Sequence, residues 1–583
     1  MEEIMKNEYR THSCGALREE NVGEEVVLSG WVDTIRDHGG ITFLDLRDRY
    51  GRTQIILSQE PSFRIGKEDV IRVHGKVRMR EEENFNDKYP TGRIEVVSSK
   101  VDLLGDCRQT LPFDIEESQK VSEDVRLKYR YLDLRNPKMQ EKLMKRCAVI
   151  QDIRTEMIGL GFCEITTPIL TVSSPEGARD YLVPSRVHQG KFYALPQAPQ
   201  QFKQLLMVAG MDKYFQIAPC FRDEDARADR SPGEFYQFDM EMSFATQEDV
   251  FKVMEHVLPK IFEKYGKYKV DQVPFKRLSY KDAMEKYGSD KPDLRNPLVI
   301  TNITKVFENT TFMAFKDKTV RAICAPKAAL LSRRTFDEIT NTAIEFGAKG
   351  LAWVKLDSEG KLVGPIVKFM SEEEQQALIK ATGIQGEDAL FIVADTDKMC
   401  SRVLGKLRTM LCDKLDLLEK DIYKFCWITD FPMYEENEET GMIDFCHNPF
   451  SMPQGGLEAL KTQSPLDILA YQYDITVNGI ELSSGAVRNH DLDIMLKAFE
   501  IAGYNEETIK AKFGAFYNAF KFGAPPHAGI APGVDRMLML LEDEDSIREI
   551  IAFPMNKKAQ DLMMGAPGDV TEQQLREVHI KLR

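Results

Sequence analysis

"FRDEDARADRSPGEFYQFDMEMSF" spans residues 221–244 and joins a cluster of opposite charges to a strict alternation of side chains. After the Pro232-Gly233 turn signal, the residues of one parity are apolar or aromatic: Tyr236, Phe238, Met240, Met242 and Phe244. The other parity carries Phe235, Gln237, Asp239, Glu241 and Ser243. A period of two predicts a β-strand with one apolar and one polar face. A polar strand face commonly meets water, but an aromatic, an amide and two acids favour a pocket wall.

The size and composition of the chain are those of a multidomain globular protein. At 583 residues it is too long for one hydrophobic core, so about two to four domains are expected. Hydrophobic residues make up 43% and charged residues 29%, as in soluble proteins. The N-terminal MEEIMKN lacks the apolar core of a signal peptide, and no run of about 18 apolar residues predicts a membrane span. We therefore expect a cytoplasmic protein with no membrane partner.

Several common kinds of site are missing from the sequence. The ten Cys form no CxxC pair, which predicts reduced, mostly buried thiols rather than disulfides or a zinc site. The sequence has no GxxxxGK[ST] and no GxGxxG after a strand, which excludes a P-loop and a Rossmann fingerprint. The net charge of −15 argues against a nucleic-acid partner unless a local basic patch binds one.

Residues 24–105 read as five short β-strands separated by glycine-containing turns, which suits a small barrel of the OB type. Basic residues are concentrated there: Arg36, Arg47, Arg49, Arg52, Arg72, Lys76, Arg78 and Arg80. Phe43 offers a stacking face and Gln54 offers hydrogen bonds to base edges. The combination suits single-stranded RNA, the alternative being a barrel whose edges are merely basic.

The remaining segments predict a linker, a helix, a strand and an inserted domain. Residues 110–135 are polar with little periodicity and predict a linker. A helix is predicted from Lys142 to Leu160, where Leu143, Cys147, Ile150, Ile153, Met157 and Leu160 recur at helical spacing. A strand follows over residues 162–170, broken by Pro168. Residues 295–415 contain short strand and helix signals without a catalytic cluster and predict an inserted domain.

A hairpin is predicted around Asn478-Gly479, because this dipeptide between apolar runs favours a two-residue turn. If Asn478 and Gly479 are the only turn residues and the strands pair regularly, then Thr476 lies opposite Glu481, Ile475 opposite Leu482 and Asp474 opposite Ser483. Asp474 and Glu481 then lie on one face, roughly 7 Å apart. Two carboxylates at this spacing suit Mg²⁺ beside a phosphate, the alternative being a solvated acidic pair on an exposed hairpin.

Two helices complete the candidate site. In "APPHAGIAPGVDRMLMLLED", residues 524–543, Gly533 permits close approach of a ligand, and Arg536 in the first helical turn predicts an anion site. A buried structural arginine is the alternative. In residues 196–210 a predicted helix places Lys203 on one face with Gln200, Gln204 and Met207. Lys203 could bind a small carboxylate, although a lone lysine near a helix start is commonly solvated.

Together these segments resemble the class II aminoacyl-tRNA synthetases. The three signature motifs of that class are matched by the segment ending at Pro168, by "FRDED…RADR…EFYQFDME" and by "GIAPGVDR". Within the class the chain is similar to the bacterial type of aspartyl-tRNA synthetase. The supporting segments are "SPEGARDYLVPSR" (174–186), "FYALPQAPQQFKQLL" (192–206), "GAKGLAWVK" (347–355), "HNPF" (447–450) and "PPHAG" (525–529).

The resemblance covers essentially the whole chain and implies an α+β fold. An N-terminal OB-fold barrel would precede an antiparallel sheet of six or seven strands flanked by helices, dimeric through the first motif. The implied divisions are 1–108 (anticodon-binding), 109–135 (hinge), 136–290 and 421–560 (catalytic), 291–420 (insertion) and 561–583 (extension). The implied reaction joins L-aspartate to ATP, giving aspartyl-adenylate and pyrophosphate, and then transfers aspartate to the 3′ end of tRNA(Asp).

The resemblance also implies roles for individual residues. Aspartate binding falls to Glu176, Gln200, Lys203, Arg222, Asp239, His447 and Arg488. ATP binding falls to Arg222, Asp223, Glu224, Phe235, Glu481, Gly533, Val534, Asp535 and Arg536, with Asp225 beside them. The catalytic group comprises Arg222, Glu481 and Arg536, Mg²⁺ binding falls to Asp474 and Glu481, and anticodon reading to Arg36, Phe43 and Gln54.

Two segments depart from the bacterial pattern. "ELSSGAVR" stands where many members have glycines after the glutamate, and its parity turns Arg488 away from Glu481. We therefore predict a β-bulge at Gly485, since regular pairing over 480–488 would exclude Arg488 from the pocket. Ser231 and an extra residue at Gly233 stand where the pattern is shorter, which leaves position 231 without an assigned ATP contact.

Other functions remain as alternatives. An asparaginyl- or lysyl-tRNA synthetase would not need Lys203 and Arg488 for an acidic substrate. A tRNA-independent aspartate–ammonia ligase would not need the barrel. A catalytically inactive RNA-binding paralogue would lack Arg222, Glu481 or Arg536, all of which are present. The sequence leaves open whether tRNA(Asn) is charged as well as tRNA(Asp).

Overall fold

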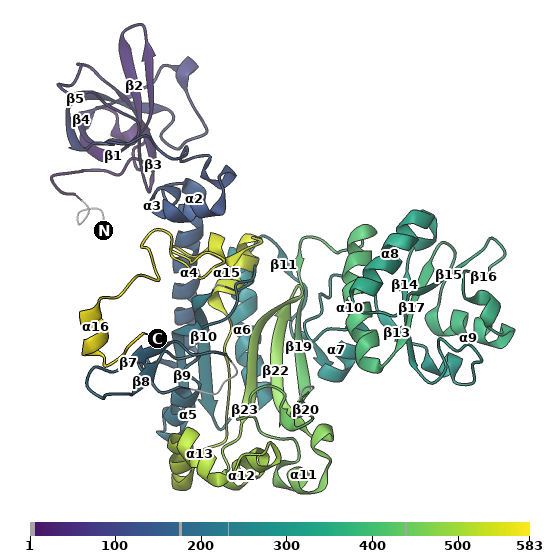
Figure 1. Ribbon diagram of the computed structural model, residues 1–583. Coiled ribbons are helices and arrows are strands. Elements are labelled where there is room, and N and C mark those ends of the chain that lie inside the picture. Colours follow the sequence, from purple (N-terminus) through teal and green to yellow (C-terminus); the bar gives the residue numbers. More distant parts are fainter. Residues whose placement is uncertain (1–5, 174–177, 231, 438–439, 583) are drawn as a thin grey trace. The chain divides into compact units, whose positions relative to one another are not determined.

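The computed structural model describes residues 6–173, 178–230, 232–437 and 440–582 (Figure 1). It contains two compact units. The first comprises Met1–Leu143 with Asp561–Gly565, and the second comprises Met144–Gln560 with Ala566–Arg583. None of the helices in the described ranges is long and apolar enough to cross a membrane.

The first unit contains a closed five-stranded barrel, as predicted. Its strands close in the order β1 (Glu25–His38), β2 (Ile41–Asp48), β3 (Gly51–Ile56), β5 (Ile94–Gly105) and β4 (Val70–Met79). Alternate residues fill the barrel, and its buried core includes Val26, Leu28, Leu44, Leu46, Ile55 and Val73. The alternation of apolar and polar residues in the sequence therefore produces an OB-type barrel.

The segment between barrel and second unit is more ordered than its composition predicts. It contains α2 (Glu123–Lys128) and α3 (Arg130–Asp133). The buried carboxylate of Asp133 pairs with Arg126 at 3.1 Å and with Arg130 at 2.5 Å. Phe113, Ile115 and Leu132 form a small core beside these helices. Buried ion pairs fold this stretch even though it lacks an apolar period.

The second unit is organised around an eight-stranded sheet. Its strand order is β12 (Lys276–Ser279), β19 (Phe425–Pro432), β22 (Leu469–Val477), β23 (Ile480–Arg488), β24 (His527–Ile530), β10 (Gly233–Ser243), β9 (Lys213–Arg222) and β6 (Cys163–Glu164). The six central strands are antiparallel, as predicted, and the two edge strands pair in parallel with β19 and β9. The strand predicted over 162–170 is wrong beyond Glu164, because proline at 168 offers no backbone N–H to a neighbour.

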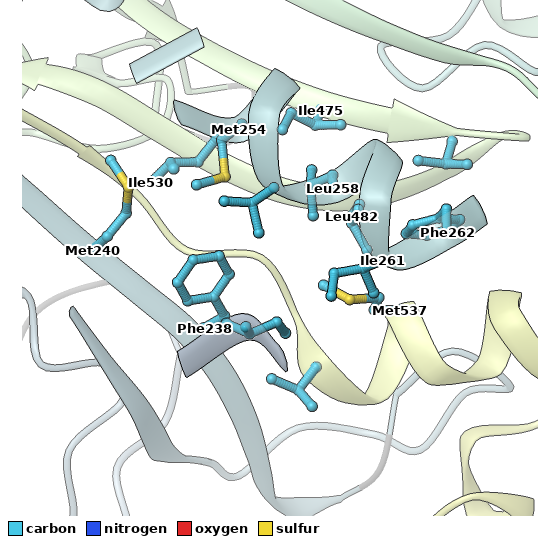
Figure 2. Close-up of a cluster of buried hydrophobic side chains, with 14 of the residues drawn as sticks. Phe238, Met240, Met254, Leu258, Ile261, Phe262, Ile475, Leu482, Ile530 and Met537 are labelled. Carbon is cyan, nitrogen blue, oxygen red and sulfur yellow. The ribbon is translucent and has the colours of Figure 1, made fainter. Parts of the chain in front are cut away.

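Helices cover the apolar face of this sheet (Figure 2). Phe238 and Met240 of β10 point toward Met254 and Leu258 of α6 (Gln247–Tyr265). Met537 of α15 (Val534–Glu542) joins the same core, as do residues of α4 (Pro137–Gly159). Further helices of this unit are α5 (Gln200–Val208), α7 (Tyr280–Tyr287), α11 (Gly456–Thr462), α12 (Leu492–Ile501), α13 (Glu506–Lys512), α14 (Gly514–Ala519) and α16 (Glu572–Glu577).

Two residues expected in the apolar pattern lie outside the core. Phe244 was placed on the apolar face of the strand, but β10 ends at Ser243. Phe244 takes a positive φ of 53° and is 76% exposed, because the chain turns there. Cys147 on α4 is exposed, and Cys163 is exposed as well, so the expectation of mostly buried thiols holds for only part of the set.

Residues within 291–420 form their own sheet in the order β13 (Ile300–Asn302), β14 (Thr319–Ala325), β17 (Ala389–Asp395), β15 (Ala352–Leu356) and β16 (Leu362–Val363). The helices α8 (Arg333–Glu345), α9 (Glu372–Thr382) and α10 (Asp397–Lys414) pack with it. Separate apolar clusters cover its two faces. Smaller two-stranded sheets are β7 (Leu182–Pro184) with β8 (Phe192–Ala194), β11 (Lys269–Val270) with β18 (Ile422–Tyr423), and β20 (Tyr434–Glu436) with β21 (Ile443–Phe445).

Candidate active site

A cavity of about 520 Å³ opens on the polar face of the large sheet. Its walls come from α5, β9, β10, β23, the start of α15 and the loop around His447. The structure brings together these predicted site residues as its lining: Gln200, Lys203, Arg222, Glu224, Phe235, Asp239, His447, Glu481, Arg488, Gly533, Asp535 and Arg536. The polar parity of β10 therefore faces a pocket and not solvent.

Four buried charges form one group at this cavity: Lys203, Asp239 and Arg488 line it, and Glu241 pairs with both cations beside it. Lys203 Nζ lies 2.6 Å from Asp239 Oδ1 and 3.4 Å from Glu241 Oε2. Arg488 donates from Nε to Glu241 Oε1 at 3.0 Å and from Nη2 to Oε2 at 3.3 Å. Two cations and two carboxylates compensate each other, which is the condition for burying charge without a large penalty.

The two carboxyls of this group respond differently to burial. Burial raises the pKa of Asp239 above its usual range, although Lys203 acts in the opposite direction. Burial also opposes ionisation of Glu241, but Arg488 and Lys203 outweigh it and hold the pKa of that carboxyl below its usual range. Asp239 Oδ2 has no hydrogen-bond partner in the described structure, so this oxygen is available to a cationic ligand.

Glu241 is a site residue that the sequence reasoning did not single out. It was placed on the polar face of the strand but received no role. The structure makes it the partner of both buried cations, Lys203 and Arg488. Its parity with Asp239 was the available signal, since residues two apart on a strand share a face.

A β-bulge brings Arg488 to the same face as Glu481, but at a position other than the predicted one. Thr476 pairs with Glu481, whereas Ile475 pairs with Ser483 and Asp474 with Ser484. Leu482 is thus the extra residue, and the pairs predicted for Leu482 and Ser483 are wrong by one position. Gly485 pairs regularly with Tyr473. It is glycine for another reason, because a Cβ there would lie 2.5 Å from the carbonyl oxygen of Gly529.

At the other end of the cavity, Arg222 lies over the ring of Phe235, with its guanidinium carbon 5.0 Å from the ring centroid. The buried Nε of Arg222 has no hydrogen-bond partner in the described structure. Glu224 pairs with Arg230, and Asp223 lies 3.6 Å from Arg179. A cation with an open donor beside an aromatic face suits a nucleotide phosphate and base.

The first turn of α15 forms a further wall. Arg536 donates from Nη1 to the carbonyl oxygen of Glu481 at 2.7 Å. The Asp535 carboxylate accepts from Arg146 at 2.5 Å and from the backbone N–H of Tyr236 at 2.9 Å, so its contacts are internal. Val534 is buried and does not line the cavity. Helix N-terminal N–H groups favour an anion here.

The predicted Mg²⁺ ligands are Asp474 and Glu481. Asp474 is buried and does not line the cavity, whereas Glu481 does. Burial, followed by the charge of Glu481, raises the pKa of Asp474 well above the usual range. Two mutually repelling carboxylates suit a divalent cation whose remaining ligands are phosphate oxygens and water. Within the described residues, no group of three or more His, Cys, Asp and Glu is arranged to hold a metal ion on its own.

His447 lines the cavity with its ring edge-on to Phe431, at 5.1 Å between centroids. Burial lowers its pKa below the ordinary histidine value, so the neutral ring predominates at neutral pH. Glu176 and Ser231 lie outside the described residues. Gly233 has φ 85°, a left-handed conformation that favours glycine at this turn.

On the barrel, Arg36 and Gln54 lie together, joined by a hydrogen bond. Arg36 donates from Nη2 to Gln54 Oε1 at 3.2 Å and to Asp45 Oδ1 at 2.9 Å. Phe43 is half-buried with its ring 6.1 Å from that of His38. Arg47 is not a surface cation as grouped above, because it is buried against Asp33 and Glu68.

Comparison with known proteins gives matches over nearly the whole chain. Residues 122–557 match the family model of class II tRNA synthetases (D, K and N), and residues 26–104 match that of the OB-fold nucleic acid binding domain. The aspartate–tRNA ligase of Streptomyces coelicolor is 55% identical over 580 residues, 99% of each chain. The aspartate–tRNA(Asp/Asn) ligase of Rickettsia bellii is 54% identical over 591 residues, 99% of this chain and 98% of the relative.

Solved structures show the same fold at lower identity. Asparaginyl-tRNA synthetase from Pyrococcus horikoshii, complexed with asparaginyl-adenylate, has a TM-score of 0.55 at 18% identity and covers 93% of this chain and 97% of its own. Aspartyl tRNA synthetase from Entamoeba histolytica has a TM-score of 0.55 at 20% identity, covering 92% of this chain and 89% of its own. At these identities the likeness speaks for the fold alone.

Proposed function

The chain belongs to the class II tRNA synthetases (D, K and N), and we propose that its charged cavity activates L-aspartate with ATP. The enzyme is an aspartate–tRNA ligase, the name carried by full-length relatives at 55% identity. The observation that carries the assignment of the site is the buried ion-pair group of Lys203, Asp239, Glu241 and Arg488, three of which line the cavity. A pocket of this charge pattern suits an amino acid with an acidic side chain.

The side-chain carboxylate and the ammonium of aspartate would each find a partner of opposite charge in this site. Lys203 and Arg488 would bind its side-chain carboxylate, the arginine through a two-pronged contact that recognises carboxylate geometry. The unpartnered Oδ2 of Asp239 would accept from its ammonium. Asparagine would leave these cations partly unpaired, which is costly in a buried site. Glu176, Gln200 and His447 would complete the shell around the substrate.

ATP would occupy the opposite end of the cavity. Phe235 would stack on adenine, and Arg222 would bind both the α-phosphate and the aspartate α-carboxylate, its open Nε donating to one of them. Arg536 would bind the adenine face and the γ-phosphate beside the backbone of Gly533, Val534 and Asp535. Asp223 and Glu224 would hold the loop that follows Arg222, since both already pair with arginines there.

The proposed reaction needs alignment and charge neutralisation more than a protein nucleophile. An oxygen of the aspartate α-carboxylate forms a bond to the α-phosphorus while the bond to pyrophosphate breaks in line. Arg222 would hold both reacting groups, and Arg536 would stabilise the departing phosphates. Mg²⁺ held by Asp474 and Glu481 would neutralise phosphate charge when bound. In the second step a ribose hydroxyl of the tRNA attacks the aspartyl carbonyl, and AMP leaves.

The barrel would read the anticodon through Arg36, Phe43 and Gln54, as its match to the OB-fold nucleic acid binding domain suggests. tRNA(Asp) is the proposed substrate. Charging of tRNA(Asn) as well is the alternative, and relatives named aspartate–tRNA(Asp/Asn) ligase are consistent with it. We further propose a homodimer that acts in the cytoplasm, with the domain divisions of the sequence analysis as its functional parts.

The test is pyrophosphate exchange into ATP with each amino acid in turn, followed by charging of purified tRNA(Asp) and tRNA(Asn). We expect exchange with aspartate alone and charging of tRNA(Asp). Charging of both tRNAs would support the alternative. Exchange with asparagine or lysine, or none with aspartate, would overturn the assignment of the cavity.

A further inference from the structure

The segment that leads into the inserted domain runs beside the catalytic hairpin. Lys291 Nζ lies 3.4 Å from Glu481 Oε2, and its side chain remains 47% exposed. Two residues later, Asp293 abuts the hairpin turn, because a Cβ added at Gly479 would lie 3.1 Å from the Asp293 Cβ. The entrance of the inserted domain therefore touches both the turn and the carboxylate of this hairpin.

A buried arginine of the inserted domain fixes this segment. Arg408 on α10 donates from Nη2 to the carbonyl oxygens of Asp293 at 2.8 Å and Asn296 at 2.7 Å, and from Nε to that of Leu298 at 2.6 Å. Asn296 returns a hydrogen bond from Nδ2 to the carbonyl oxygen of Arg408 at 3.1 Å. Arg408 is 3% exposed, so these bonds are shielded from water and stiffen the path of the backbone.

The two oxygens of the Glu481 carboxylate face different cations. Oε2 faces Lys291, whereas Oε1 lies 3.9 Å from Arg536 Nη1. Glu481 lines the cavity and Lys291 does not, so the direct contact of Lys291 with the cavity wall is its ion pair with Glu481. The charge of Lys291 also acts on Asp474 and His447 from a greater distance. Without a partner on Oε2 a glutamate side chain would sample several rotamers, and ordering it on ATP binding would cost free energy.

We propose that Lys291 is a positioning residue for ATP binding, and that the inserted domain sets its place through Arg408. Lys291 holds the Glu481 carboxylate in the orientation that the ATP end of the cavity requires. The inserted domain thereby acts on the activation step without contributing a side chain to the cavity wall. The inference rests on the proposed function, because it takes this cavity to be the ATP site.

Variants of Lys291 test whether Lys291 positions Glu481 for ATP binding. Since an exposed ion pair contributes modestly, we expect Lys291→Ala to raise the KM for ATP about three- to five-fold in aspartate-dependent exchange, with the KM for aspartate unchanged. Lys291→Arg should restore the KM for ATP. Calorimetry should show the same loss of affinity for α,β-methylene ATP with Mg²⁺, a readout independent of turnover. Equal KM and affinity in Lys291→Ala and the unmodified enzyme would overturn the role of Lys291.

A double-mutant cycle tests whether the inserted domain acts through Lys291. Arg408→Lys should raise the KM for ATP in the unmodified chain but add nothing to Lys291→Ala, because both changes act on the same contact. Arg334→Lys is the control, since Arg334 is an arginine of the inserted domain whose partner Glu338 lies on the same helix α8, away from the segment that carries Lys291. It should leave both KM values unchanged. Additive effects of the Arg408 and Lys291 changes would show that the inserted domain does not act through Lys291.

The same measurements distinguish a failure of the proposed function from a failure of the positioning role of Lys291. If the unmodified enzyme shows no aspartate-dependent exchange, the proposed function fails, and the inference fails with it. If the unmodified enzyme is active and Lys291→Ala matches it, the proposed function stands and the positioning role alone is wrong. Should Arg408→Lys fail to fold, the Lys291 variants still decide the role of Lys291, because its exposed side chain can be changed without disturbing the core.

Discussion

At the residue scale, Arg488 shows why charge alone does not define this site. Its planar guanidinium contacts both oxygens of Glu241 from within a buried wall. Lysine would keep the charge but could not make both contacts at once. The geometry of the guanidinium, together with its charge, therefore underlies the proposed preference for an acidic amino acid.

Arg488→Lys should raise the KM for aspartate about 10- to 100-fold, because hydrogen bonds to charged groups contribute roughly 1.5–3 kcal/mol. The KM for ATP should stay within about two-fold, since the ATP end of the cavity is built from other residues. Pyrophosphate exchange with each substrate varied in turn measures both constants. Arg277→Lys is the control, because Arg277 also contacts both oxygens of a glutamate, Glu248, but through Nη1 and Nη2 and on the surface. An equal rise in both KM values would contradict a specific role for Arg488.

His527 predicts how stability depends on pH. Its ring is fully buried, and Nδ1 lies 2.8 Å from the carbonyl oxygen of Pro525. Burial lowers its pKa below 6.5, so between these two values the unfolded chain binds a proton that the native chain does not. This contribution to stability is complete above pH 6.5 and is lost as pH falls through the lowered pKa, by at most about 1.4 kcal/mol per pH unit.

Calorimetric Tm values at pH 7.5, 6.5 and 5.5 should accordingly show a smaller acid-side decrease in His527→Gln than in the unmodified enzyme. His256→Gln is the control, because His256 lies on the surface beside Glu156. Its Tm profile should follow that of the unmodified enzyme. If the profile of His527→Gln does so too, His527 does not contribute to acid sensitivity.

At the element scale, the close approach of β24 to β10 depends on Gly529. A Cβ at this position would lie 2.0 Å from Glu241 Oε2 and 2.3 Å from the carbonyl oxygen of Met240. Gly529→Ala should therefore push Glu241 away from Arg488 and cost about 3 kcal/mol, near the upper end for overpacking. A lower Tm together with a higher KM for aspartate is the expected result.

Gly159→Ala provides the matched control for this substitution. Gly159 is the last residue of α4, and nothing lies within 4 Å of a Cβ there. The same chemical change should be neutral or stabilising by up to about 1 kcal/mol, because alanine favours helix more than glycine does. If both variants lose stability equally, close packing at Gly529 is not the cause.

The same scale shows what the sequence could and could not predict. The Asn478-Gly479 hairpin, the buried face of α5 and the two-faced strand β10 were predictable, since each follows from a local period or turn preference. The position of the bulge was not, because it depends on how Ile475 and Leu482 pack in the core. Nor was the order in residues 110–135, where ion pairs at Asp133 take the place of an apolar pattern.

At the scale of the whole molecule, the lining of the cavity comes entirely from the second compact unit. A chain that begins at Pro137 should keep aspartate-dependent exchange within about three-fold. Charging of tRNA should fall about 100-fold or more, since base–aromatic stacking on the barrel would contribute roughly 1–3 kcal/mol per base. Comparing exchange with charging in the truncated and full-length enzymes measures this, and equal losses of the two activities would contradict it.

The pairing of β10 with β24 also has a consequence for synthesis of the chain. Ser243 and His527 pair in the sheet but are about 280 positions apart, so at roughly 5–20 residues per second about 15 to 60 seconds separate their emergence from the ribosome. During that time the edge of β10 that later pairs with β24 has no partner. The side chains of Phe238 and Met240 also lack those core neighbours that come later in the chain. Ribosome-bound chains halted at residue 420 should be cut by protease within β10 more readily than full-length chains released from the ribosome. The nascent enzyme thus offers chaperones an aggregation-prone strand while the inserted domain is being made.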